Sequence, residues 1–206
     1  MPRRCYRKGG EQMKGSYDIM IVGIGGQGTI LASNIIGEAC ILEGRTVRGA
    51  ETHGMAQRGG SVESHVRIDG KFGPLIAPGT ADLLIGFDLL EGLRYSHFLR
   101  PDGKIVLSER LVIPTSVYVQ HLAIPSSEEL VKQLSRFNLT LIKAEEIAKE
   151  AGSVLASNVV MLGAASHQIP LDESSLIQAV QRLVPKKTIE INTRAFTMGR
   201  KVGPGC

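Results

Sequence analysis

A glycine-rich segment directly after an apolar run constrains the fold of this chain more than any other feature. Tyr17–Val22 is largely apolar, and Gly23-Ile24-Gly25-Gly26-Gln27-Gly28-Thr29 follows it at once. This order predicts a strand, a loop with little side-chain bulk, and a helix that begins near Thr29. In such a loop several backbone N–H groups point outward at the positive end of a helix dipole, where they can bind a phosphate or another anion. The candidate binding residues of this loop are Gly23, Gly25, Gly26, Gln27, Gly28 and Thr29.

Strand and helix patterns alternate along most of the chain, and helix patterns dominate its end. Strands are predicted at Tyr17–Val22, Arg45–Ala50, Ser61–Ile68, Lys71–Ile76, Ala81–Phe87, Lys104–Ser108 and Asn138–Ile142, with a further extended segment at Ser116–Ile124. Helices are predicted at Thr29–Glu43, Asp88–Leu99, Ser126–Arg136, Ala144–Ala151, Ser157–His167, Asp172–Leu183 and Thr188–Val202. The pattern predicts a three-layer α/β/α sandwich with a mostly parallel sheet and a C-terminal helical group packed on one side.

Two local signals predict how the first strands pair. A strand, a helix and a strand within about thirty residues form a right-handed crossover, so strands 17–22 and 45–50 are expected to be parallel neighbours. Asp69-Gly70 is a strong hairpin turn between Ser61–Ile68 and Lys71–Ile76. This hairpin is expected to form an antiparallel edge of the sheet.

The charge of the chain gives little support for nucleic-acid binding. The net charge is +4, much of it from the N-terminal tail, and the chain has no tryptophan. No apolar run is long enough to predict a membrane span. We expect Met1–Ser16 to be a disordered basic tail, of which residues 1–12 are either an extension or an over-long start, and residues 17–206 to form a single domain.

The cysteines argue against a metal or cluster site built from this chain alone. Cys5, Cys40 and Cys206 are far apart, and no CxxC pair exists. Free thiols favour a reducing, cytoplasmic setting.

A second polar loop follows the second predicted strand. Its sequence is Glu51-Thr52-His53-Gly54-Met55-Ala56-Gln57-Arg58-Gly59-Gly60-Ser61. This loop should lie at the same carboxyl edge of the sheet as the glycine loop, where open α/β sheets bind ligands. Arg58, with Gly59 and Gly60 beside it, could present a guanidinium fork and bare N–H groups to a carboxylate or phosphate, and His53 could donate a proton. An ordinary surface loop remains the alternative. The candidate residues are His53 and Arg58 for catalysis and Gln57, Gly59 and Gly60 for binding.

A dinucleotide site would need an acidic residue at the end of the second strand to bind the ribose hydroxyls. Glu51 lies near that place. However, the chain then enters an antiparallel hairpin and not a second nucleotide-binding half, so we discount NAD.

Other polar residues have sufficient structural explanations. We interpret Ser33, Asn34, Ser157 and Asn158 as capping or helix-surface residues, and His65, His97, His121 and His167 as structural. No Ser/His/Asp or Cys/His group can be identified, so the sequence does not indicate chemistry carried wholly by this chain.

The two loops together resemble the small, gamma-type subunit of the 2-oxoacid:ferredoxin oxidoreductases. The resemblance covers nearly the whole chain, from about Tyr17 to Val202. The string His53-Gly54-Met55-Ala56-Gln57-Arg58-Gly59-Gly60 is more specific than the glycine loop and is most similar to the indolepyruvate branch of the family. Residues Met1–Gln12 depart from the family pattern without affecting a candidate site.

The resemblance implies a reaction and a set of partners. The family oxidises a 2-oxoacid with coenzyme A to an acyl-CoA and carbon dioxide and passes two electrons to ferredoxin. Thiamine diphosphate with magnesium and 4Fe–4S clusters would lie on a large partner subunit. This chain would bind none of these cofactors alone, and its two loops would face the partner's active site. An exposed partner face would also allow the isolated chain to form a homodimer.

Three other interpretations remain open. The nearest is a gamma subunit of the pyruvate or ketoisovalerate type. The other two belong to different classes: a stand-alone dinucleotide-binding protein that uses the Gly23–Gly28 loop, and a regulatory or scaffolding domain whose loops bind only protein.

Overall fold

The computed structural model describes residues 16–53, 60–113 and 126–204. Its centre is a six-stranded sheet in the order β2-β3-β1-β4-β5-β6. The strands are β1 (Tyr17–Ile24), β2 (Val47–His53), β3 (Ser61–Ile68), β4 (Ala81–Gly86), β5 (Leu99–Ser108) and β6 (Asn138–Ile142). Strands β1, β4, β5 and β6 are parallel, whereas β3 pairs antiparallel with both β1 and β2.

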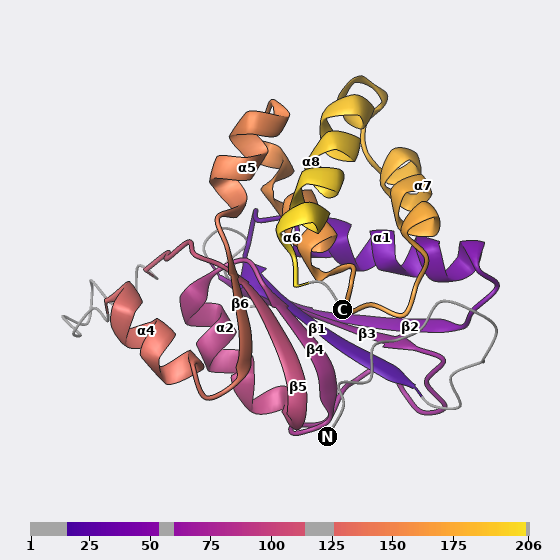
Figure 1. Cartoon of the computed structure of the whole chain (residues 1–206). Coiled ribbons are helices and arrows are strands. Elements are labelled where there is room, and N and C mark those ends of the chain that lie inside the picture. Colours follow the sequence, from indigo (N-terminus) through magenta and orange to yellow (C-terminus); the bar gives the residue numbers. More distant parts are fainter. Residues whose placement is uncertain (1–15, 54–59, 114–125, 205–206) are drawn as a thin grey trace.

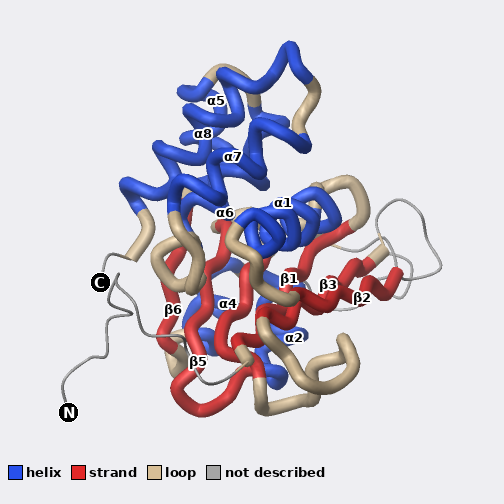
Figure 2. The backbone as a smooth tube through the Cα atoms, turned by 90° about the vertical axis from the view of Figure 1, so that its right-hand side faces the viewer, coloured by secondary structure: helices blue, strands red, loops and turns tan. Residues whose placement is uncertain are grey.

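Helices cover both faces of the sheet, which confirms the predicted three-layer sandwich. They are α1 (Thr29–Leu42), α2 (Leu89–Tyr95), α4 (Ser127–Leu134), α5 (Ala144–Ala151), α6 (Ser157–Ala165), α7 (Glu173–Leu183) and α8 (Ile189–Val202). Short 3-10 turns are η1 (Ser96–Phe98), η2 (Val154–Ala156) and η3 (Lys186–Thr188). Figures 1 and 2 show α1 and the C-terminal helices on one face of the sheet and α2 and α4 on the other.

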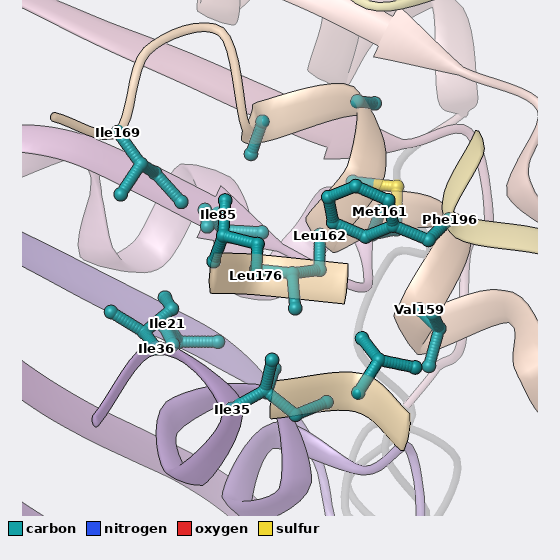
Figure 3. Packing of buried hydrophobic residues seen from close by; sticks show 14 of the residues in the cluster. Ile21, Ile35, Ile36, Ile85, Val159, Met161, Leu162, Ile169, Leu176 and Phe196 are labelled. Atoms are coloured by element: carbon teal, nitrogen blue, oxygen red, sulfur yellow. The ribbon is translucent and has the colours of Figure 1, made fainter. Parts of the chain in front are cut away.

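The sheet separates two hydrophobic clusters. On the α1 face, Ile21 and Ile85 of the sheet pack with Ile35 of α1 and with Leu162 and Phe196 of the C-terminal helices. Figure 3 shows these side chains converging between the strands and the helices. The opposite cluster joins alternate residues of the same strands to α2 and α4. Because β1 and β4 are buried along their whole length, both faces of these strands lie in the core, as the apolar run Ala81–Phe87 predicts for β4.

The predicted pairing of the first two strands is wrong. Strands β1 and β2 do run in the same direction, but β3 lies between them and bonds to both. The crossover rule gives the handedness of a connection between two parallel strands of one sheet and does not require them to be adjacent. In this fold the chain turns back after β2 and inserts β3 into the gap.

The predicted hairpin partner is also wrong, although the antiparallel edge is confirmed. Within the described residues, Lys71–Ile76 form no strand, and the edge consists of β2 and β3. Hydrogen bonds to side chains fix the 70–76 segment, where a strand would have formed a backbone ladder. The Ile76 N–H donates to His65 Nδ1 at 3.1 Å, and Arg67 Nη1 donates to the Gly73 carbonyl at 3.0 Å.

Several boundaries differ from the sequence predictions. Strand β2 includes Glu51–His53, which the sequence pattern assigns to the loop. Strand β5 begins at Leu99 and not at Lys104, since the chain enters the sheet directly after η1. Helix α2 therefore ends at Tyr95 and not at Leu99, and Pro101-Asp102-Gly103, a sequence typical of a turn, lies inside β5. The extended segment predicted at 116–124 and the tail at 1–15 lie outside the described residues.

Candidate functional site

The glycine loop joins the end of β1 to α1, as predicted. The loop closes through two contacts of Gln27: its N–H donates to the Ile24 carbonyl at 3.0 Å, and its Oε1 accepts from the Ile24 N–H at 2.7 Å. Gly26 and Gly28 have φ angles of 100° and 83°. Side chains rarely adopt this backbone conformation, so the turn depends on glycine at both positions.

The second loop begins and ends at the same edge of the sheet. Ile24 at the end of β1 pairs with Ser61 at the start of β3, and His53 at the end of β2 pairs with Val62. The Gly25 N–H donates to the Gly60 carbonyl at 2.8 Å. The ends of the two loops therefore meet, as expected from the sequence. Gln57, Arg58 and Gly59 lie outside the described residues, and His53 is placed only as part of β2.

A buried cluster anchors β3 where it leaves the second loop. The Ser61 hydroxyl donates to Glu91 Oε2 and lies 3.1 Å from the Tyr95 hydroxyl. Glu91 is 1% exposed, and Arg94 Nη1 lies 2.6 Å from its other carboxylate oxygen. Burial raises the pKa of Tyr95. Sequence reasoning missed this cluster because no local pattern relates Ser61 to a helix thirty residues later.

Asp88 is a second buried carboxylate at this edge. Its Oδ1 caps α2 by accepting from the Leu90 N–H at 2.9 Å, and its Oδ2 accepts from the Val112 N–H at 2.6 Å. Burial raises the pKa of Asp88. Helix α2 thus anchors both the start of β3 and the segment after β5.

Glu51, the residue considered for binding ribose hydroxyls, does not occupy the position that a dinucleotide site needs. Glu51 accepts a hydrogen bond from the Ser33 hydroxyl at 3.1 Å. Moreover, β3 separates β2 from β1, so Glu51 stands one strand further from the glycine loop than in the dinucleotide pattern. This geometry argues against the dinucleotide alternative.

A cavity of about 110 Å³ lies at the same edge, beside the glycine loop. Gly26 and Gln27 line it from the loop, Ser108 and Arg110 from the end of β5, and Asn158 from the first turn of α6. Asn158 is 8% exposed, and its side chain lies against Gly28. This corrects the interpretation of Asn158 as a helix-surface residue, because Asn158 is buried. Its Oδ1 does accept from the Val159 N–H in the first turn of α6, although the N-cap residue is Ala156.

The described histidines other than His53 have structural contacts. His65 Nδ1 accepts from a backbone N–H, while His97 and His167 contact the carbonyls of Arg94 and Arg200. His121 lies outside the described residues. Among the residues that the structure describes, no group of three His, Cys, Asp or Glu side chains could hold a metal ion. Within the same residues, no helix is long and apolar enough to cross a membrane.

The fold and the edge define an α/β/α domain whose two loops adjoin at the carboxyl edge of the sheet. The chain belongs to the pyruvate ferredoxin/flavodoxin oxidoreductase family, whose model matches residues 18–202. Within this family it corresponds to the small, gamma-type subunit.

Curated relatives support this assignment along nearly the whole chain. Indolepyruvate oxidoreductase subunit IorB of Archaeoglobus fulgidus is 40% identical over 186 residues, which cover 88% of this chain and 92% of the relative. The same subunit of Thermococcus kodakarensis is 36% identical over 191 residues, which cover 90% of this chain and 95% of the relative.

Solved structures share the fold. The gamma subunit of a keto/oxoacid ferredoxin oxidoreductase from Geobacter sulfurreducens superimposes with a TM-score of 0.67 at 28% identity, covering 90% of this chain and 96% of that subunit. A pyruvate oxidoreductase subunit from Thermotoga maritima gives a TM-score of 0.70 at 22% identity, covering 92% of this chain and 97% of that subunit.

Proposed function

We propose that this chain is the small subunit of an indolepyruvate-type 2-oxoacid:ferredoxin oxidoreductase. The complete enzyme would convert an aryl pyruvate such as indolepyruvate, with coenzyme A, to an acyl-CoA and carbon dioxide and pass two electrons to ferredoxin. The main support is the 40% identity over 186 residues to an indolepyruvate oxidoreductase subunit. A common gamma subunit of pyruvate/ketoisovalerate oxidoreductases from Pyrococcus abyssi matches less well, at 30% over 156 residues.

The proposal places the redox cofactors on a large partner subunit. Thiamine diphosphate with magnesium and 4Fe–4S clusters would there supply the decarboxylation and the electron transfer. Two features of the described residues argue against these groups being bound at the carboxyl edge of this chain. Burial raises the pKa of the Cys40 thiol to about 12, so this thiol is a poor cluster ligand at neutral pH. The cavity of about 110 Å³ is also smaller than the roughly 300–1,000 Å³ that a cofactor of this size requires.

This chain would supply one wall of the active site. Its two loops would close over the partner's reaction centre, exclude water and orient a reactant. In this arrangement Arg58 would bind a carboxylate or phosphate, and His53 would donate a hydrogen bond or a proton. The contact between Gly25 and Gly60 supports this proposal because it brings the ends of both loops to one edge.

Reconstitution tests the proposed function. The chain alone should not oxidise 2-oxoacids. Mixed with the large subunit, coenzyme A and an electron acceptor, it should support oxidation of indolepyruvate faster than of pyruvate, 2-oxoisovalerate or 2-oxoglutarate. Arg58→Ala should lower kcat/KM roughly 10- to 100-fold, the cost of one charge-assisted hydrogen bond.

Arg182→Ala is the matched control, because Arg182 on α7 pairs with Glu38 and is remote from the edge loops in sequence. Its activity should equal that of the unaltered chain. Equal losses in both variants would contradict the role of Arg58. Oxidation of 2-oxoacids by the chain alone, or tight binding of NAD or FAD, would contradict the proposed function itself.

A further inference from the structure

The cavity at the carboxyl edge carries hydrogen-bond donors that no described residue uses. Gln27 Nε2 is buried and has no partner among the described residues, while Gln27 Oε1 is committed to the Ile24 N–H. Asn158 Oδ1 accepts from the Val159 N–H at 2.9 Å, and its Nδ2 makes no hydrogen bond within the described part of the chain. A buried donor without an acceptor is unfavourable, so the Gln27 amide indicates an acceptor other than the described residues, and the Asn158 amide beside the cavity adds a second free donor.

Two helix N-termini converge on the same cavity. Helix α1 begins after Gly28 and α6 after Ala156; neither N-cap residue provides a side-chain cap, and neither helix has an acidic residue in its first turn. The two helices touch at this point: a Cβ on Gly28 would lie 2.2 Å from Asn158 Nδ2. The N-terminus of α1 leaves backbone N–H groups unbonded within the described residues, whereas in α6 the Ser157 N–H donates to the Val154 carbonyl and the Val159 N–H to Asn158 Oδ1. Both N-termini carry a partial positive charge that favours an anion.

The charged side chains that line the cavity balance each other. Glu145 is the acidic residue among its described lining, and Arg110 Nη1 lies 2.7 Å from its carboxylate. Both side chains are about 40% exposed, so the pair lies near solvent. Ser108, which is 4% exposed, adds a buried hydroxyl. The interior of the cavity therefore offers donors, and its described lining holds no competing free carboxylate.

We propose that this cavity binds a single oxyanion, a phosphate or a carboxylate group, between the N-termini of α1 and α6. Gln27 Nε2 and Asn158 Nδ2 donate to it, together with free N–H groups of the glycine loop. A volume of about 110 Å³ equals the share of three to four water molecules, which suits one such group and not a whole cofactor. Which molecule carries this anion depends on the proposed function, in which the same edge faces the large subunit. The groups proposed to bind the anion all come from this chain.

An NMR titration of the full chain with inorganic phosphate, and separately with acetate, tests this site. Ionic strength is held constant with chloride. We expect saturable shifts of the Gly26 and Gly28 amides and of the Gln27 and Asn158 side-chain amides. Saturation by phosphate alone would assign a phosphate group, saturation by acetate alone a carboxylate, and saturation by both the oxyanion chemistry they share.

Gln27→Glu keeps the oxygen that accepts from the Ile24 N–H and replaces the unpaired donor with a second carboxylate oxygen. It should weaken anion binding about tenfold or more. Gln181→Glu makes the same chemical change at an exposed position of α7 and should leave the affinity unchanged. Asn158→Asp tests the donor from α6, so a folding defect in one variant does not remove the test.

The absence of saturable shifts with both anions would overturn the proposal. Equal affinity in Gln27→Glu, Asn158→Asp and the unaltered chain would also overturn it, as would shifts confined to exposed lysines and arginines. These outcomes differ from a failure of the proposed function, because anion binding is measured without the large subunit and reconstitution is measured with it.

Discussion

Single buried polar residues fix the carboxyl edge of the sheet. Glu91 holds Ser61 at the start of β3, and Asp88 holds Val112 in the segment after β5. Both carboxylates are almost completely buried. Because a buried carboxylate that loses its partner is strongly unfavourable, these contacts restrict where the neighbouring loops can begin and end.

The contact of Gly28 with Asn158 gives a prediction at this scale. Gly28→Ala should destabilise the fold by about 2–4 kcal/mol, because it combines a left-handed backbone with a side-chain clash. Gly26→Ala is the matched control. Gly26 also has a positive φ, but a Cβ there would meet no described atom within 4 Å, so only the backbone cost of about 1–2 kcal/mol applies.

Urea unfolding measures both changes. Adding Asn158→Ala to Gly28→Ala should make the effect of the glycine substitution approach that of Gly26→Ala. Equal free-energy losses for the two single glycine variants would show that the clash is not present.

His65 gives a prediction of pH dependence. Burial lowers the pKa of His65 from 6.5, although Glu63 at 3.8 Å opposes the shift. Between the lowered value and 6.5 the unfolded chain binds more protons than the folded one, so stability should fall as the pH decreases through this window. His65→Asn keeps an acceptor for the Ile76 N–H and removes the titration.

Urea midpoints at about pH 7.5 and pH 5.5 measure this contribution. The decrease in stability should be smaller in His65→Asn than in the unaltered chain. His97→Asn changes an exposed histidine and should leave the decrease as it is. A larger decrease in His65→Asn would contradict the predicted direction of the pH dependence.

At the scale of helices and strands, glycines allow α6 and α8 to pack with their backbones in close contact. A Cβ on Gly163 would lie 2.1 Å from the Phe196 carbonyl oxygen, and one on Gly199 would lie 2.0 Å from the Val160 carbonyl oxygen. Because the opposing atoms are backbone, no side-chain rotation can relieve the overlap. The C-terminal helical group therefore depends on these two positions.

Gly163→Ala should cost about 3 kcal/mol or more and separate α8 from α6. Gly37→Ala in α1 is the control, since a Cβ there meets no described atom and the φ is ordinary. This control should be neutral or stabilising by up to about 1 kcal/mol. Thermal unfolding of both variants measures the difference in Tm. A Gly163→Ala variant as stable as Gly37→Ala would contradict the close backbone contact between α6 and α8.

The positions of the helices and strands could largely be predicted from the sequence, whereas the order of the strands in the sheet could not. Alternating and continuous apolar runs predicted the six strands of the described sheet and the helices of both layers. Periodicity says nothing about which strand enters a gap, so the insertion of β3 between β1 and β2 was missed. The sequence did predict that both loops share one edge, because this follows from strand direction. It could not predict that Asn158 lies against Gly28, because this contact depends on the packing of α6.

At the scale of the whole molecule, two exposed apolar side chains lie at the carboxyl edge. Leu155 in η2 is 91% exposed and Val154 is 38% exposed, and both line the cavity beside the glycine loop. Single exposed apolar residues are common on protein surfaces. These two stand at the edge where the proposed function places the large subunit.

Hydrogen–deuterium exchange of this chain, alone and in complex with the large subunit, tests the central claim most directly. If the edge forms half of a shared active site, backbone amides around Gly26, Gly60 and Leu155 should exchange more slowly in the complex, while those around Gln181 on α7 should not change. Unchanged exchange at the edge, with protection elsewhere on the chain, would contradict the claim that these two loops face the partner.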